Sequence, residues 1–297
     1  MHSRTIFLSL RPPFLLLTVV CILLAFSLVA LSGKTFDPVL MLAVFLAGLF
    51  AHIGVNVLNE YLDFSSGLDL QTIKTPFSGG SGALPQNPAA AGAVLKTAIA
   101  SITLSAVLGF YLLLEQGSQL LIPGLVGLLI IIAYTRWINR MPWLCLIAPG
   151  TGFGLIMVGG SYYALVGESS VTVLLVSLLP FLLVNNLLLL NQYPDIQADQ
   201  SVGRNHFPIR YGVAASNRVF LAFLVCSAVL LAGLILDQRL PALAWLSLLA
   251  LAPAVFAYSG ARKYGNTIGQ QPQYLAANVA SVLLTPLLLA LSIFFGK

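Results

Sequence analysis

Long apolar runs divide this chain into nine segments, each near the roughly 20 residues that a helix needs to cross a bilayer. Apolar residues make up 59% of the sequence and charged residues only 8%, against roughly 25% charged in a soluble domain. The runs are continuous rather than alternating, so helices, not barrel strands, are expected to satisfy the backbone in lipid. The expected spans are residues 13–31, 38–58, 91–114, 120–134, 144–166, 171–190, 219–236, 241–258 and 274–295.

The pattern predicts an all-α polytopic membrane protein, with one domain over residues 1–297 and nine transmembrane helices. If the N-terminus is inside, eleven of the 14 lysines and arginines fall on the cytoplasmic side, and only Lys34, Arg239 and Lys297 fall outside. We therefore expect a bacterial or archaeal cell-membrane protein with its N-terminus and active site in the cytoplasm. Its predicted partner is the lipid bilayer, and no nucleic-acid partner is expected.

Two similar stretches hold five of the nine acidic residues of the chain. Residues 59–63 read Asn-Glu-Tyr-Leu-Asp and are followed by Asp69, whereas residues 191–195 read Asn-Gln-Tyr-Pro-Asp and are followed by Asp199. Each stretch ends a long apolar run. Carboxylates at the edge of a hydrocarbon phase are unfavourable unless a cation compensates them. Their clustering predicts bound metal and an anionic ligand, as in a membrane enzyme that acts on a phosphorylated lipid.

The spacing of polar residues places each motif on one helix face. The first stripe, at intervals of four, three and four residues, consists of His52, Asn56, Asn59 and Asp63. Such a stripe is untenable against lipid, so it is expected to face the interior of the bundle. The second motif, spaced by four and with an expected helix kink at Pro194, consists of Asn191, Asp195 and Asp199. Both helices are expected to direct acidic ends into one central cavity that opens to the cytoplasm.

A loop with glycines and basic residues follows each motif. The first loop, residues 72–82, contains Lys74 and three glycines, and the second contains Arg204 and Arg210. Glycine and serine amides can approach an anion closely, and the basic residues supply charge. These loops are predicted to contact phosphate. The alternative is a pair of flexible connectors whose basic residues meet the membrane surface.

With these motifs the chain resembles the UbiA superfamily of intramembrane prenyltransferases. Its members carry an Asn-Asp-x-x-Asp motif after the second span and an Asp-x-x-x-Asp motif after the sixth, each followed by a basic loop with glycine. The first motif here, with Asp69 six residues beyond Asp63, is similar in spacing to the menaquinone branch. Two positions depart from that pattern: Glu60 stands where the family usually has Asp, and Asn205-His206 stand where menaquinone enzymes commonly have Arg-Thr.

The resemblance implies Mg2+-dependent transfer of a polyprenyl group from a polyprenyl diphosphate to an aromatic acceptor through an allylic carbocation. The implied metal ligands are Asn59, Glu60, Asp63, Asp69, Asn191, Asp195 and Asp199. The implied substrate-binding residues are Asn59, Asn191, Lys74, Arg140, Arg204 and Arg210. The implied catalytic residues are Asp63, Asp195, Lys74, Arg140, Arg204 and Tyr134. The cations would stabilise the departing diphosphate, and the tyrosine ring would shield the allylic cation.

The acceptor is the least determined part of this interpretation. A dihydroxynaphthoate-like ring is preferred over 4-hydroxybenzoate. Transfer to glyceryl phosphate or a sugar phosphate, and cyclisation of the prenyl chain, stay open. A cation-coupled transporter is a further alternative, but it would place the acids near the membrane midplane on broken helices, whereas here they are expected at helix ends on one side.

Overall fold

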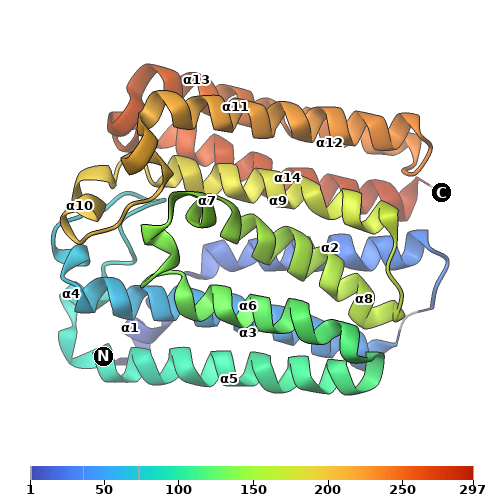
Figure 1. The fold of residues 1–297 in the computed structure, drawn as a ribbon, viewed down its shortest axis with the longest axis horizontal. Helices are drawn as coiled ribbons and strands as arrows, with labels where there is room; N and C mark the ends of the chain where they lie inside the picture. Colours follow the sequence, from blue (N-terminus) through green and yellow to red (C-terminus); the bar gives the residue numbers. More distant parts are fainter. Residues whose placement is uncertain (1, 36, 73, 297) are drawn as a thin grey trace.

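The computed structural model describes residues 2–35, 37–72 and 74–296, and all regular structure in them is helical. The long helices lie side by side along one axis (Figure 1). The α-helices are α1 (His2–Ser9), α2 (Pro12–Leu31), α3 (Pro38–Ser65), α4 (Ala83–Gln86), α5 (Ala91–Gln116), α6 (Leu121–Ala133), α7 (Pro142–Gly150), α8 (Ser161–Val166), α9 (Val171–Asn191), α10 (Ile196–Ser201), α11 (Phe207–Leu236), α12 (Leu246–Leu249), α13 (Ala252–Tyr264) and α14 (Pro272–Phe295). A π-helical segment, Thr151–Gly160, joins α7 to α8. The 3-10 helices are Leu68–Leu70, Pro88–Ala90, Ser118–Leu120, Ile138–Arg140, Ala242–Trp245 and Gly265–Gln270.

Eight helical segments of the described chain are long and apolar enough to cross a membrane. The expected span 120–134 corresponds to a shorter apolar helix, Ser118–Ala133, so a ninth crossing stays a prediction. Large apolar side chains face outward, including Phe110 (61% exposed) and Val229 (67% exposed). Exposed apolar surface of this extent is what a lipid environment requires.

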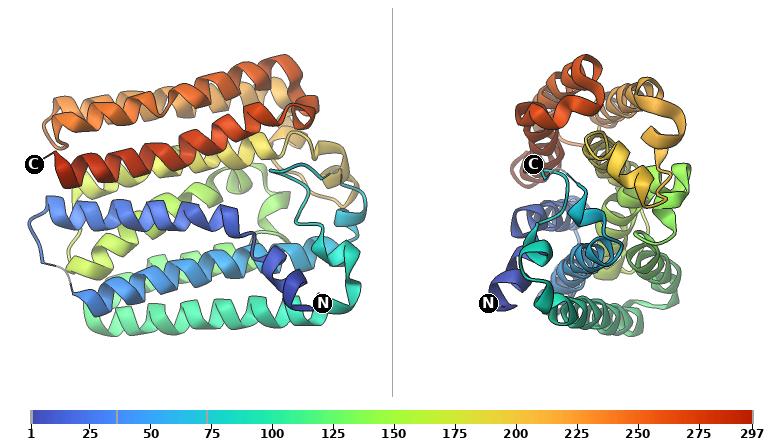
Figure 2. Two further views of the ribbon diagram at one scale, coloured as in Figure 1. Left: turned by 180° about the vertical axis from the view of Figure 1, so that it is seen from behind. Right: turned by 90° about the vertical axis from the view of Figure 1, so that its left-hand side faces the viewer.

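The connections that carry the two acidic motifs lie at the same end of the bundle. Helices α1, α4 and α10 lie at this end, and α14 finishes at the opposite end (Figure 1). Figure 2, right, looks onto the motif end, where these connections cover the helix ends. The hydroxyl of Ser201 joins them by donating to Gln71 Oε1 at 2.8 Å. The expected convergence of the motifs at one end is therefore present.

The expectation of a kinked helix at Pro194 is wrong. Helix α9 ends at Asn191, and a separate short helix begins at Ile196. Since proline cannot donate an amide hydrogen and clashes with the preceding turn, a break rather than a bend results here. Asp195 consequently occupies the N-cap of α10 rather than a helix interior.

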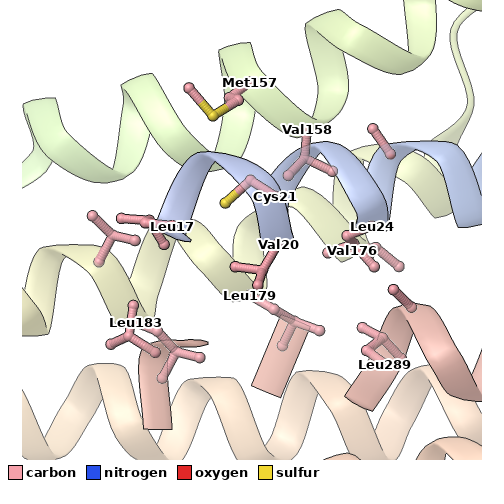
Figure 3. Packing of buried hydrophobic residues seen from close by; sticks show 14 of the residues in the cluster. Leu17, Val20, Cys21, Leu24, Met157, Val158, Val176, Leu179, Leu183 and Leu289 are labelled. Atoms are coloured by element: carbon pink, nitrogen blue, oxygen red, sulfur yellow. The ribbon is translucent and has the colours of Figure 1, made fainter. Parts of the chain in front are cut away.

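Helix α2 lies in the middle of the apolar core. Its Leu17, Val20, Cys21 and Leu24 pack among side chains of α9, α14 and the π-helical segment (Figure 3). Helix α2 contacts α14, α3 and the π-helical segment, and α3 packs along α5. Close packing of this kind holds helices together in lipid, where the hydrophobic effect between them is weak.

Buried polar side chains join helices across the bundle. The hydroxyl of Thr18 and His52 Nδ1 lie 2.8 Å apart between α2 and α3. The amide of Asn186 donates to the carbonyl of Phe220 at 2.9 Å, and the Gly150 N–H donates to Asn185 Oδ1 at 2.6 Å. Such bonds satisfy polar groups that lipid cannot.

Glycines allow helix α7 and the π-helical segment to approach α9 closely. A Cβ added at Gly154 would lie 2.5 Å from both the Phe181 nitrogen and the Ser177 carbonyl oxygen. At Gly150 it would lie 2.2 Å from the Phe181 carbonyl oxygen. Backbone cannot move aside as a side chain can, so this contact depends on the small residues.

We expect Gly154→Ala to lower the thermal unfolding temperature in detergent, because the added methyl group forces the two helices apart. The overpacking penalty is roughly 1–3 kcal/mol. The matched control is Gly152→Ala in the same π-helical segment, where an added Cβ meets no atom within 4 Å. Equal unfolding temperatures for the two variants would show that the close approach contributes no stability.

Candidate active site

A cavity of about 700 Å³ runs from the motif end into the apolar interior. Its inner walls come from α3, α5, α6 and the π-helical segment, with apolar side chains such as Val44, Leu128 and Ile156. Its outer end is polar. The predicted site residues that line it are Asn59, Asp63, Asp69, Tyr134, Asn191, Asp195, Asp199 and Arg204.

The first motif follows from how α3 ends. Asn59 and Asp63 occupy one face of its last turns, and Asn59 Nδ2 donates to Thr135 Oγ1 at 3.1 Å. Gly67 then takes a positive φ of 78°, which glycine adopts without the clash that a Cβ would cause. The chain turns there and places Asp69 on a 3-10 helix beside the same cavity.

Arg204 joins the two motifs. Its Nη2 donates to Asp63, and its Nη1 donates to Asp199 Oδ1 at 2.7 Å. Burial alone would lower the pKa of Arg204, but the two carboxylates outweigh burial and raise the pKa above its usual value. The arginine therefore stays charged, and it compensates one carboxylate from each motif.

Among the described residues, neither Asp69 nor Asp195 forms an ion pair like those that Arg204 forms with Asp63 and Asp199. Burial, followed by the Asp63 and Glu60 carboxylates, raises the pKa of Asp69 to about 7. Burial, followed by Asp199, raises the pKa of Asp195 to about 7 as well. Both carboxylates thus lie in a region with more negative charge than the protein itself compensates.

The oxygen donors of this region suit Mg2+. Asp69 Oδ2, Asn191 Oδ1 and Asp195 Oδ1 are buried without a hydrogen-bond partner in the described structure. Among the described residues, no three acidic, histidine or cysteine side chains converge tightly enough to hold a metal alone. Mg2+ commonly takes only one or two carboxylates and completes its shell with water and substrate phosphate. The residues present therefore fit a metal that binds together with a diphosphate.

A glycine-rich loop, residues 74–82, lies at the cavity between the motifs. Three of its residues, Ser78, Gly79 and Gly80, line the cavity. Gly80 has a φ of 72°, and a Cβ there would lie 2.9 Å from Asp69 Oδ1. The Ser78 hydroxyl and the Gly79 amide lower the pKa of Asp195, although not enough to offset its burial. The loop is thus close to both motifs, as an anion-binding loop should be. Ile73, in the same predicted loop, lies outside the described residues.

Glu60 does not lie with the predicted metal ligands. It is fully buried outside the cavity lining, where Oε1 accepts from Arg11 Nε at 2.8 Å and from the Ser81 amide at 2.6 Å. The Ser81 hydroxyl donates to Oε2 at 2.6 Å. Asn59 and Asp63 line the cavity, whereas the Glu60 side chain is directed toward Arg11 and Ser81. It fastens the glycine-rich loop and the start of α2 to α3.

Three predicted cations are also absent from the cavity lining. Lys74, Arg140 and Arg210 are exposed at the motif end, and Lys74 donates to the Ser81 carbonyl. Helical spacing could not place them, because each lies in or next to a connection. The cavity lining also includes polar residues that were not predicted as site residues, among them Arg11, Asn139, Cys145, Gln192 and His206.

Comparison with known proteins finds a family model and relatives that are all prenyltransferases. The model of the UbiA prenyltransferase family matches residues 18–277. The 1,4-dihydroxy-2-naphthoate octaprenyltransferase of Escherichia coli (strain K12) is 29% identical, over 97% of this chain and 94% of that protein. The protein of the same name from Bacillus subtilis (strain 168) is 27% identical, over 76% of this chain and 72% of that protein.

Solved structures share the fold. A UbiA homolog from Aeropyrum pernix K1 superposes with a TM-score of 0.65 at 18% identity, covering 93% of this chain and 96% of that one. A UbiA homolog from Archaeoglobus fulgidus, bound to DMAPP and Mg2+, superposes with a TM-score of 0.61 at 14% identity, covering 94% and 99%.

We expect Glu60→Ala to reduce thermal stability, because it leaves Arg11 without its buried partner. Loss of one partner from a buried pair costs roughly 3–5 kcal/mol, and less where the other partner is partly exposed. Turnover should fall as the loop loosens, while the Mg2+ concentration that gives half-maximal activity stays unchanged. A shifted Mg2+ titration at wild-type stability would identify Glu60 as a metal ligand instead.

Proposed function

The chain belongs to the UbiA prenyltransferase family, and we propose that it transfers a polyprenyl group from a polyprenyl diphosphate to a dihydroxynaphthoate-like aromatic acid. The observation that carries this proposal is the active-site cavity, with both acidic motifs at one end and apolar walls along the rest. It accommodates a ligand with an anionic head and an apolar tail. As a family member the protein is an integral membrane prenyltransferase, not a transporter. The distribution of basic residues supports a cell-membrane location with the motif end in the cytoplasm.

Mg2+ is the proposed cofactor. The residues that would hold it are Asp63, Asp69, Asn191, Asp195 and Asp199, with Asn59. Asp69, Asn191 and Asp195 each have a buried oxygen without a hydrogen-bond partner among the described residues. When bound, the metal would neutralise charge on the diphosphate and so favour its departure. The charge of the metal would also oppose the burial and the carboxylate repulsion that raise the pKa values of Asp69 and Asp195.

The remaining steps use the protein's own groups. The glycine-rich loop and Arg204 hold the diphosphate, and the C1–O bond breaks with its electron pair passing to the diphosphate. The apolar walls keep water from the allylic cation, and the ring of Tyr134 faces the same cavity. A ring carbon of the acceptor bonds to C1 and then releases what it carried there, either a proton that a base takes up or a carboxylate lost as CO2, and the electron pair of that bond restores aromaticity. Lys74, Arg140 and Arg210, outside the cavity, attract anionic substrates to this end of the bundle.

Metal dependence provides the first test. Asp195→Asn retains the shape of the side chain but removes a negative charge, so we expect turnover to fall roughly 10²–10³-fold, as for loss of other transition-state charge stabilisation. EDTA should abolish activity of the wild-type protein, and added Mg2+ should restore it. Diphosphate release would be measured on purified protein in nanodiscs. Wild-type turnover by Asp195→Asn and Asp63→Asn would exclude the proposed site.

The acceptor provides the second test. We expect 1,4-dihydroxy-2-naphthoate to be prenylated with a higher kcat/KM than 4-hydroxybenzoate, and glyceryl phosphate to give no product. The three acceptors would be supplied at matched concentrations with one polyprenyl diphosphate and Mg2+, and lipid products identified by mass spectrometry. Product from glyceryl phosphate alone would overturn the aromatic assignment and leave the metal chemistry intact.

A further inference from the structure

One side of the cavity is polar but carries little charge. It is built from Tyr134, Asn139, Cys145, Gln192 and His206, all in the cavity lining. Gln192 Nε2 donates to Cys145 Sγ at 3.3 Å, and the Tyr134 hydroxyl lies 3.8 Å from the same sulfur. We call these five residues the neutral chamber. It adjoins the second motif, because His206 contacts Asp199 directly.

The connections that carry Asn139 and His206 are fixed to each other. The Asn205 amide donates to the Asn139 carbonyl at 3.0 Å, which joins the α6–α7 connection to the loop before α11. His206 Nε2 lies 2.9 Å from Asp199 Oδ2, and Arg204 holds the other oxygen of the same carboxylate. The orientation of the imidazole is therefore set by a group that is itself held in place.

Two buried atoms of the neutral chamber lack partners among the described residues. They are His206 Nδ1 and Asn139 Oδ1, in side chains that are 1% and 4% exposed. In the tautomer that donates its Nε2 hydrogen to Asp199, His206 presents Nδ1 as an acceptor. Asn139 Nδ2 donates to the Thr135 carbonyl at 2.5 Å, which fixes the amide so that Oδ1 is the free acceptor. Both unpaired atoms therefore require a hydrogen-bond donor.

The requirement for donors discriminates between the two substrates. An ionised diphosphate and a carboxylate are acceptors only, so neither can satisfy Nδ1 or Oδ1. A ring hydroxyl is a donor. We propose that the neutral chamber binds the aromatic acceptor through its hydroxyl groups, with His206 and Asn139 as the residues that select a hydroxylated ring. This assignment rests on the proposed function, because it specifies how that reaction recognises its acceptor.

The test pairs a change in the protein with a change in the substrate. The acceptors are 1,4-dihydroxy-2-naphthoate and its two mono-O-methyl ethers, each of which lacks one donor. We expect the wild-type protein to prefer the dihydroxy acid over at least one ether by about tenfold or more in kcat/KM, since a site built for a hydroxyl rejects analogues that lack it. His206→Phe and Asn139→Ala should reduce that preference to about twofold or less. The KM for polyprenyl diphosphate should stay within about twofold of the wild-type value in Asn139→Ala, whereas His206→Phe also removes a partner of Asp199.

Two further variants separate recognition from folding. His206→Gln retains both a donor for Asp199 and an acceptor, so it should regain part of the preference that His206→Phe loses. Asn266→Ala makes the same chemical change as Asn139→Ala at an exposed position of the 3-10 helix Gly265–Gln270, and should leave every constant unchanged.

The outcomes separate the role of the neutral chamber from the proposed function. If the wild-type protein prenylates the dihydroxy acid but His206→Phe and Asn139→Ala keep its full preference over the ethers, the role of the chamber is overturned and the proposed function stands. Equal use of all three acceptors by the wild-type protein overturns it too. If only a non-aromatic acceptor such as glyceryl phosphate gives product, both the proposed function and this inference are wrong.

Discussion

The ion pairs of Arg204 with Asp63 and Asp199 connect the two halves of the site. The partners come from the end of α3 and from α10, which are far apart in the sequence. Carboxylates at the edge of lipid need a compensating cation, and one buried arginine supplies it for both motifs. Without it, the two acidic ends would repel each other across the cavity.

The active-site cavity contains three chemically distinct regions. Asp69, Asp195 and Asn191 offer free oxygens where a metal and a diphosphate would bind. The neutral chamber beside Asp199 offers hydrogen-bond acceptors, and the walls from α3, α5 and α6 are apolar. These regions suit a diphosphate head, a hydroxylated ring and a prenyl tail. In the proposed arrangement the ring would lie next to the end of the prenyl chain that reacts.

Much of this arrangement could be predicted from the sequence. Continuous apolar runs indicated the helical class, and the interval between Asn59 and Asp63 placed both on the cavity-facing side of α3. The second motif reaches the same cavity although α9 ends at Asn191, so helical spacing did not predict its geometry. Periodicity alone could not separate Glu60 from its neighbours, because its partners Arg11 and Ser81 come from distant segments. The break after Asn191 depended on whether Pro194 bends or ends a helix. His206 gave only a loop signal, since its importance comes from the contact with Asp199.

We propose that both acidic motifs bind one metal-diphosphate assembly. This binding is tested most directly by a crystal structure of the protein with Mn2+ and a non-hydrolysable polyprenyl thiodiphosphate, with anomalous scattering used to locate the metal. We predict Mn2+ peaks between the carboxylates of Asp63 and Asp69 and those of Asp195 and Asp199, next to the diphosphate. A bound diphosphate with its metal on only one motif, or with Mn2+ elsewhere in the protein, would contradict the account.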